Sequence, residues 1–320
     1  MTNNSVDNTL GGGASFNVSP WSKNGKWIVY RDSSSIGGNI CKINAASGIS
    51  NCMTNGFLNT SEYVFNPSFG TDYKIYFEKR VASDYEIWRM NSDGTNKENL
   101  TAAHSGTSER YVKVSPDAQW IAFFSNNALW VAQSDGTMAH NVSGFFLVDS
   151  PQHSWSPDSQ WLVYQGVEGG QRWIYKVRMD GTENQSLTKP NAMINPQIHL
   201  WPSWSPDGEK IAYLWSGDGL FEHADYIKII TKDGQLLQTM LDSAVRPLAD
   251  TTIGIYGPFS WSPDSQWITY IKKGGGDNAI FITNVEDPAE KAQLTNNYDD
   301  SRPIWSPAGD RILFVDAGIP

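Results

Sequence analysis

The sequence predicts an all-β fold, a β-propeller, from three observations. Four segments are close copies of one another: SWSPDSQWLVY at 154–164, SWSPDGEKIAY at 203–213, SWSPDSQWITY at 260–270 and IWSPAGDRILF at 304–314. Weaker copies bring the number of repeats to seven, with spacings of 41 to 57 residues, which suit a four-stranded propeller blade. No segment shows a sustained helical period with capping residues, whereas strand-like alternation follows each copy.

Each repeat is aligned on one anchor residue, which ends the first strand of its unit. The seven anchors are Trp21, Phe69, Val114, Trp155, Trp204, Trp261 and Trp305. After the anchor, Ser-Pro-Asp predicts a tight turn, and a second strand follows. A third strand leads to Asp-Gly hairpin turns, at Asp93-Gly94, Asp135-Gly136, Asp180-Gly181 and Asp233-Gly234. A more polar fourth strand closes the unit, so the sequence predicts seven blades of four antiparallel strands.

The ends of the chain bear on the number of blades. Only two strands remain after the seventh anchor, and the N-terminal segment resembles the fourth strands of other repeats. We therefore predict a single domain over residues 1–320, a ring in which residues 1–16 are a tail that forms the closing strand. The N- and C-terminal strands then share one blade, which removes exposed sheet edges. A six-bladed ring, with the C-terminal strands used otherwise, is the alternative.

The repeat also resembles that of a known family. The pattern WSPDG, then IAY or IAF, an Asp-Gly hairpin and a Leu-Thr ending is similar to the repeat of TolB-type β-propellers, from about residue 17 to residue 316. The resemblance implies the fold. It does not choose a function, because the same repeat occurs in periplasmic interaction proteins, in oligogalacturonate-lyase relatives and in propeller domains of prolyl-oligopeptidase-type peptidases. A peptidase would need a Gly-x-Ser-x-Gly elbow, which the sequence lacks.

Charge and composition exclude some partners. The net charge is −10 and no run of Lys or Arg occurs, so we expect no nucleic acid partner. No stretch approaches 18 consecutive apolar residues, so we expect no membrane insertion. The polar segment after Met1 lacks the basic and apolar regions of a signal peptide. We expect a monomer in the periplasm or outside the cell, whose export signal is absent from this chain.

The two cysteines lie at equal distances from the centre of a predicted hairpin. Cys41 and Cys52 flank the turn at Ala45–Gly48, so they face each other on neighbouring strands. We expect a disulfide, which would indicate an oxidising compartment. Two reduced thiols packed within a blade are the alternative.

Residues that recur in most repeats are more simply explained by architecture than by an active site. Function is therefore expected where the repeats differ, on the face that carries the longer, irregular loops. Residues just before each anchor begin the inner strands and are expected to surround the mouth of a central channel. The predicted ligand-binding residues there and in the fifth repeat are Glu109, Arg110, Tyr111, His153, His199, Trp201, Trp215, Phe221, Tyr256, Asp300 and Arg302.

This mixture of aromatic and charged side chains favours a non-enzymatic binding scaffold for a protein or another polar ligand, without a cofactor. A lectin-like propeller is one alternative, in which Trp201, Trp215 and Phe221 stack on sugar rings. A lyase acting on acidic polysaccharides is another, for which the related propellers imply a divalent metal or a histidine base near the channel. Its base would be His153 or His199, its acid Tyr111 or Tyr256, and its carboxylate clamp Arg110 or Arg302.

Overall fold

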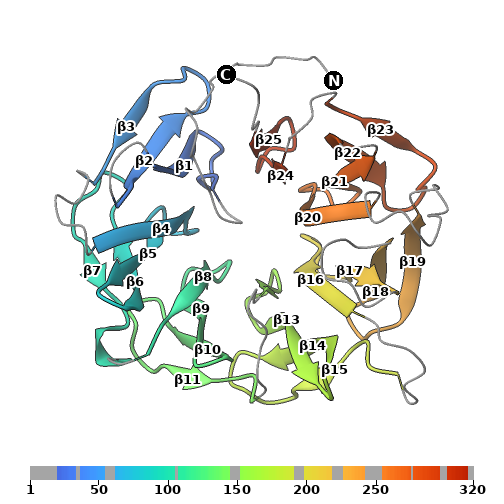
Figure 1. The fold of residues 1–320 in the computed structure, drawn as a ribbon, viewed down its shortest axis with the longest axis horizontal. Helices are drawn as coiled ribbons and strands as arrows, with labels where there is room; N and C mark the ends of the chain where they lie inside the picture. Colours follow the sequence, from blue (N-terminus) through green and yellow to red (C-terminus); the bar gives the residue numbers. More distant parts are fainter. Residues whose placement is uncertain are drawn as a thin grey trace. The chain divides into compact units, whose positions relative to one another are not determined.

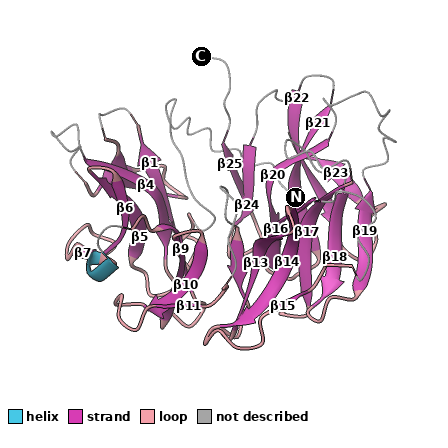
Figure 2. Cartoon of the chain, turned by 60° about the horizontal axis from the view of Figure 1, so that its bottom comes forward, coloured by secondary structure: helices cyan, strands magenta, loops and turns pink. Residues whose placement is uncertain are grey.

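The computed structural model describes residues 20–33, 37–54, 62–104, 107–144, 152–190, 198–217, 226–241, 254–274, 277–295 and 301–315. Within these ranges the chain forms twenty-five strands and one short 3-10 helix, η1 (Ala102–His104). Figure 2 colours the strands magenta and the helix cyan. The predicted all-β fold is confirmed. The described part contains no helix with the length and hydropathy needed to span a membrane.

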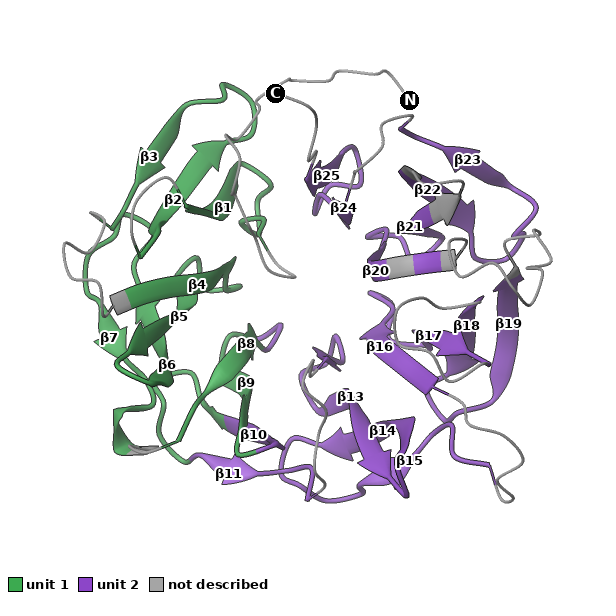
Figure 3. Cartoon of the chain, viewed as in Figure 1, with its two compact units in different colours: residues 1–114, 118–126, 132–138 green, residues 115–117, 127–131, 139–320 purple. Residues whose placement is uncertain are grey.

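The chain divides into two compact units, coloured in Figure 3. Unit 1 comprises residues 1–114, 118–126 and 132–138, and unit 2 comprises residues 115–117, 127–131 and 139–320. The single domain over residues 1–320 stays a prediction.

Unit 1 contains two complete antiparallel sheets whose strands lie side by side in chain order (Figure 1). The first consists of β1 (Trp27–Asp32), β2 (Asn39–Asn44) and β3 (Ser50–Cys52). The second consists of β4 (Glu62–Phe69), β5 (Ile75–Val81), β6 (Asp84–Met90) and β7 (Glu98–Asn99). A further sheet, of order β11-β10-β9-β8, includes residues of both units: β8 (Arg110–Val114), β9 (Trp120–Ser125), β10 (Ala128–Gln133) and β11 (His140–Asn141).

Unit 2 contains the remaining strands. The first group is β12 (His153–Trp155), β13 (Trp161–Glu168), β14 (Gln171–Arg178) and β15 (Gln185–Ser186). The second is β16 (Ile198–Trp204), β17 (Lys210–Ser216), β18 (Tyr226–Thr231) and β19 (Leu236–Leu241). One parallel residue pair between β14 and β16 joins these two groups into one sheet. The last two sheets are β20 (Gly254–Trp261), β21 (Trp267–Gly274), β22 (Asp277–Asn284) and β23 (Lys291–Gln293), followed by β24 (Ser301–Trp305) and β25 (Ile312–Val315).

The repeated Ser-Pro-Asp segments form hydrogen-bonded turns. The hydroxyl of Ser156 donates to Oδ1 of Asp158 at 2.5 Å, and Oγ of Ser156 accepts a hydrogen bond from the N–H of Trp161 at 2.9 Å. Ser205 and Ser262 make the same pair of contacts in the next two repeats. The anchor Trp155 beside this turn is only 7% exposed. The serine, the aspartate and the anchor tryptophan that recur in these repeats therefore have a structural role.

The Asp-Gly turns are fastened by long basic side chains from another repeat. Within unit 1, Nζ of Lys42 donates to the carbonyl of Ser92 at 2.5 Å, and Nη1 of Arg89 donates to the carbonyl of Ser134 at 2.6 Å. Within unit 2, Nζ of Lys176 donates to the carbonyl of Lys232 at 2.7 Å. Every acceptor directly precedes an Asp-Gly pair. We call these three contacts the turn tethers; they hold the Asp-Gly turns at Asp93, Asp135 and Asp233 in place.

Candidate functional site

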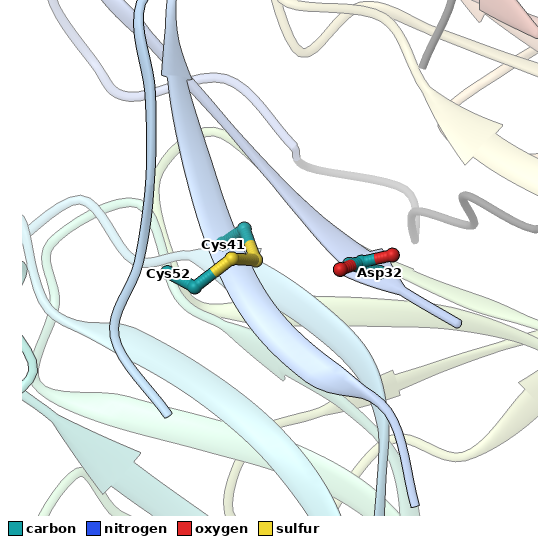
Figure 4. Close-up of side chains that lie close together, drawn as sticks. All are labelled: Asp32, Cys41 and Cys52. Carbon is teal, nitrogen blue, oxygen red and sulfur yellow. A yellow bond between two sulfur atoms is a disulfide. The ribbon is translucent and has the colours of Figure 1, made fainter. Parts of the chain in front are cut away.

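The cysteine pair forms the predicted disulfide. Cys41 in β2 and Cys52 in β3 are directly opposite each other and bonded, and Figure 4 shows Asp32 of β1 beside them. The Asp32 carboxylate and the two sulfur atoms lie within 4.8 Å of one another. Because the sulfurs are bonded to each other, neither is available as a thiolate metal ligand. The bridge thus has a structural role.

Five of the inner strands share a feature that the sequence analysis did not predict, a β-bulge three or four residues before the anchor. The pairing register shifts in β4, β8, β16, β20 and β24. At each shift one residue has a positive φ: Asn66 (47°), Tyr111 (60°), Trp201 (58°), Gly257 (65°) and Arg302 (55°). We call these five the bulge residues. A positive φ costs free energy for a residue other than glycine, and a bulge redirects its side chain.

Three of the predicted ligand-binding residues, Tyr111, Trp201 and Arg302, are bulge residues. Arg302 is exposed, and Tyr111 and Trp201 are half-buried. Trp201 packs against the hydrophobic core of unit 2. The β-bulge with its positive φ is thus repeated along the chain, whereas the residue at the bulge differs from repeat to repeat.

Two bulges in unit 1 are organised by a buried carboxylate that the sequence analysis missed. The side chain of Glu78, in β5, has no exposed surface. Its Oε1 accepts hydrogen bonds from Nδ2 of Asn66 at 2.9 Å and from the N–H of Tyr111 at 2.8 Å, and its Oε2 accepts one from Nε of Arg110 at 3.2 Å. One carboxylate therefore connects the bulge of β4 with the bulge of β8.

Arg110 lies between two aromatic rings. Its Cζ is 4.3 Å from the centre of the Tyr85 ring and 4.8 Å from that of the Tyr111 ring. Burial acts to lower the pKa of Arg110, but the Glu78 charge raises it, and the net shift is upward. Two more arginines lie over aromatic rings in the same unit, with Cζ of Arg31 5.0 Å from Phe65 and Cζ of Arg80 6.0 Å from Tyr85.

We call this cluster the arginine–aromatic patch. It comprises Arg31, Phe65, Arg80, Tyr85, Arg110 and Tyr111. Only Arg110 and Tyr111 were predicted from the sequence. The patch carries three positive charges in a chain whose net charge is −10.

The predicted Glu109 points into the protein. Its side chain is buried, and Oε1 accepts hydrogen bonds from the hydroxyl of Ser125 at 3.0 Å and from the hydroxyl of Thr107. These contacts assign Glu109 a structural role.

Both predicted histidines are buried, His153 fully and His199 with 3% exposure. The His199 ring stacks on Tyr213 at 5.1 Å and meets the edge of Trp173 at 5.0 Å. Desolvation, and to a lesser degree the charge of Lys228, lower the pKa of His199 to about 3. The imidazole is therefore neutral at physiological pH and a weak base.

Trp215 is half-buried, and Nζ of Lys228 lies 4.0 Å from the centre of its ring. Tyr226 contacts the same side chain, with ring centres 5.3 Å apart. Of the other predicted residues, Phe221 and Asp300 lie outside the described residues. The backbone of Tyr256 lies in β20, opposite Ile271.

Comparisons with known proteins identify the fold. No protein-family model matches the sequence. An uncharacterized protein of Agrobacterium fabrum is 26% identical over 204 residues, which span 63% of this chain and 63% of that relative. A putative TolB from Agrobacterium tumefaciens has a TM-score of 0.52 at 19% identity, covering 70% of this chain and 80% of that structure. TolB from Acinetobacter baumannii has a TM-score of 0.60 at 14% identity, with coverages of 88% and 67%.

The chain has a TolB-like β-propeller fold. An oligogalacturonate lyase in complex with manganese is also similar, with a TM-score of 0.69 at 10% identity over 94% of this chain and 86% of that structure. At such identities the likeness shows the fold alone, since one fold hosts many functions.

Proposed function

We propose that the protein is a monomeric, non-enzymatic TolB-like β-propeller that binds a protein partner through its bulge residues, without a cofactor. The proposal includes seven blades, the last completed by residues 1–16. It also includes an exported location, supported by the disulfide, because disulfides persist in oxidising compartments.

The observation that carries the proposal is the contrast between a repeated bulge and its varying side chain. Bulges are common where a strand must redirect a side chain for function. In this chain the bulge residues carry different side chains: Asn66 binds Glu78, Trp201 packs against the core, Tyr111 is half-buried and Arg302 is exposed. A rigid scaffold that presents different side chains at equivalent places is suited to recognition.

One residue of each alternative, His199 for the lyase and Trp215 for the lectin, is placed unfavourably for its role. For a lyase, a general base needs a pKa near the working pH, whereas that of His199 is about 3. For a lectin, Trp215 would need an open ring face to stack on a sugar, and Lys228 lies over this ring. These contacts disfavour His199 as a general base and Trp215 as a sugar platform, and to that extent they support a protein-binding scaffold.

Site-specific photo-crosslinking in the source cell tests the proposal. A photoreactive phenylalanine derivative replaces Tyr111 or Arg302 in separate variants. The matched controls carry it at Tyr73, which is 46% exposed, or at Met138, which is 68% exposed. We expect one discrete cross-linked protein from the bulge positions and none from the controls. Absence of a cross-linked protein, or the same products from the controls, would contradict the proposal.

A further inference from the structure

The buried Glu78 departs from the pattern of the repeat. The equivalent second-strand positions are occupied by Arg31, Phe124, Gln165, Leu214, Ile271 and Val315. Four of these six are apolar, as expected for a strand packed on both faces. A fully buried carboxylate is costly unless it is paired and hydrogen-bonded. Because a glutamate occupies this position in only one repeat, we infer its role from the residues that it contacts there.

Glu78 orients Arg110. The carboxylate binds Nε of the guanidinium, while the rings of Tyr85 and Tyr111 lie within 5 Å of Cζ. In the described part of the chain, Nη1 and Nη2 of Arg110 have no hydrogen-bond partner. The side chain is 35% exposed. Arg110 therefore presents an oriented pair of donors to solvent.

We propose that Nη1 and Nη2 of Arg110 bind a carboxylate in an acidic segment of a protein partner, with Arg80 supplying a second positive charge beside the same Tyr85 ring. This inference rests on the proposed function as a protein-binding scaffold. A planar guanidinium matches a carboxylate with two parallel hydrogen bonds. Because Glu78 and the two rings already hold Arg110, little side-chain entropy is lost on binding.

The patch favours an acidic peptide over a sugar ring. Arg110 lies over both tyrosine rings and Arg31 lies over Phe65, so these aromatic surfaces are already engaged by cations. The overall charge of −10 opposes an anionic ligand, but charges beyond about 10 Å are largely screened at physiological salt. The nearby charges are those of the three patch arginines, with Glu78, which binds Arg110, and Asp84, next to Tyr85, as opposing acids.

Binding of a fluorescein-labelled hexaglutamate peptide to the whole chain, measured by fluorescence anisotropy at low salt, tests the inference. Hexaglutamine is the neutral control peptide. Arg110→Lys keeps a positive charge next to Glu78 but loses the paired donors, so we expect the Kd for hexaglutamate to rise at least roughly tenfold. We expect a smaller rise, of about threefold, for Arg80→Gln, which removes one charge near the surface.

Arg178→Lys is the matched control. Arg178 also lies over an aromatic ring, 5.2 Å from the centre of Trp161, and pairs with Glu183 at 3.2 Å, but it belongs to unit 2. We expect its Kd to equal that of the wild type. Melting temperatures of all variants confirm that they are folded.

Three outcomes would overturn the inference. The first is equal affinity of wild type and Arg110→Lys for hexaglutamate. The second is no binding of hexaglutamate by the wild type; cross-linking at Tyr111 then decides separately whether the protein-binding scaffold stands. The third is binding of polygalacturonate, but not of hexaglutamate, that is lost in Arg110→Lys. That result would keep the carboxylate site but assign it to an acidic glycan, against the proposed function.

Discussion

Replacing Arg110 by leucine should destabilise the protein more than replacing its partner Glu78 by glutamine. Arg110→Leu leaves a carboxylate with no exposed surface and no counter-charge. Removing one partner of a buried ion pair costs 3–5 kcal/mol. Since Asn66 and the N–H of Tyr111 still donate to Glu78, we expect the lower end, about 3 kcal/mol.

Glu78→Gln has a milder effect. The amide oxygen can still accept hydrogen bonds from Asn66 and Tyr111, and Arg110 is 35% exposed, so water can solvate it. We expect a loss of about 1–2 kcal/mol. Arg178→Leu, which breaks a pair whose side chains are 38% and 58% exposed, should cost less than about 1 kcal/mol.

Urea unfolding followed by tryptophan fluorescence measures these differences as shifts of the midpoint at a common m value. The double variant Glu78→Leu/Arg110→Leu provides a second comparison. It removes the buried charge altogether, so it should be more stable than Arg110→Leu alone. If Arg110→Leu costs no more than Arg178→Leu, or if the double variant recovers nothing, Arg110 does not compensate the charge of Glu78.

Three further predictions concern stability. The pKa of His199 is about 3 in the folded chain and near 6.5 when unfolded, so the unfolded state takes up a proton first and stability falls as the pH drops below 6.5. Between pH 7.5 and pH 5 the wild type should lose about 2 kcal/mol more than His199→Phe, and equal losses in urea unfolding would contradict this. Replacing Cys41 and Cys52 together by alanine should lower the free energy of unfolding by at most about 3 kcal/mol, and addition of a reductant should then have no effect. Gly136→Ala should lower the melting temperature more than Gly144→Ala: both have positive φ, but a Cβ at Gly136 would lie 2.1 Å from the Leu100 carbonyl oxygen, whereas one at Gly144 meets nothing within 4 Å.

The structural features that could be predicted from the sequence are those that depend on contacts between residues close in sequence. Strand order, the Ser-Pro-Asp turns and the cysteine pair follow from local patterns, because a turn or hairpin is determined by neighbouring residues. The bulges were missed because a register shift depends on how two strands pair. Arg110 was predicted from its place before an anchor, but its partner Glu78 is 32 residues away and Tyr85 is 25 residues away. Only the packing of one sheet against the next brings these side chains together.

One sequence signal could nevertheless have identified Glu78. Aligning the second strands puts a glutamate where four of the other six repeats have an apolar residue, and a local departure from a pattern can indicate function. Tight turns and turn tethers fix one end of the sheets, while the bulge residues lie toward the opposite end of the inner strands, since each inner strand runs from its bulge to its anchor. The buried charge of Glu78 lies at the bulge end, where its contacts orient Arg110.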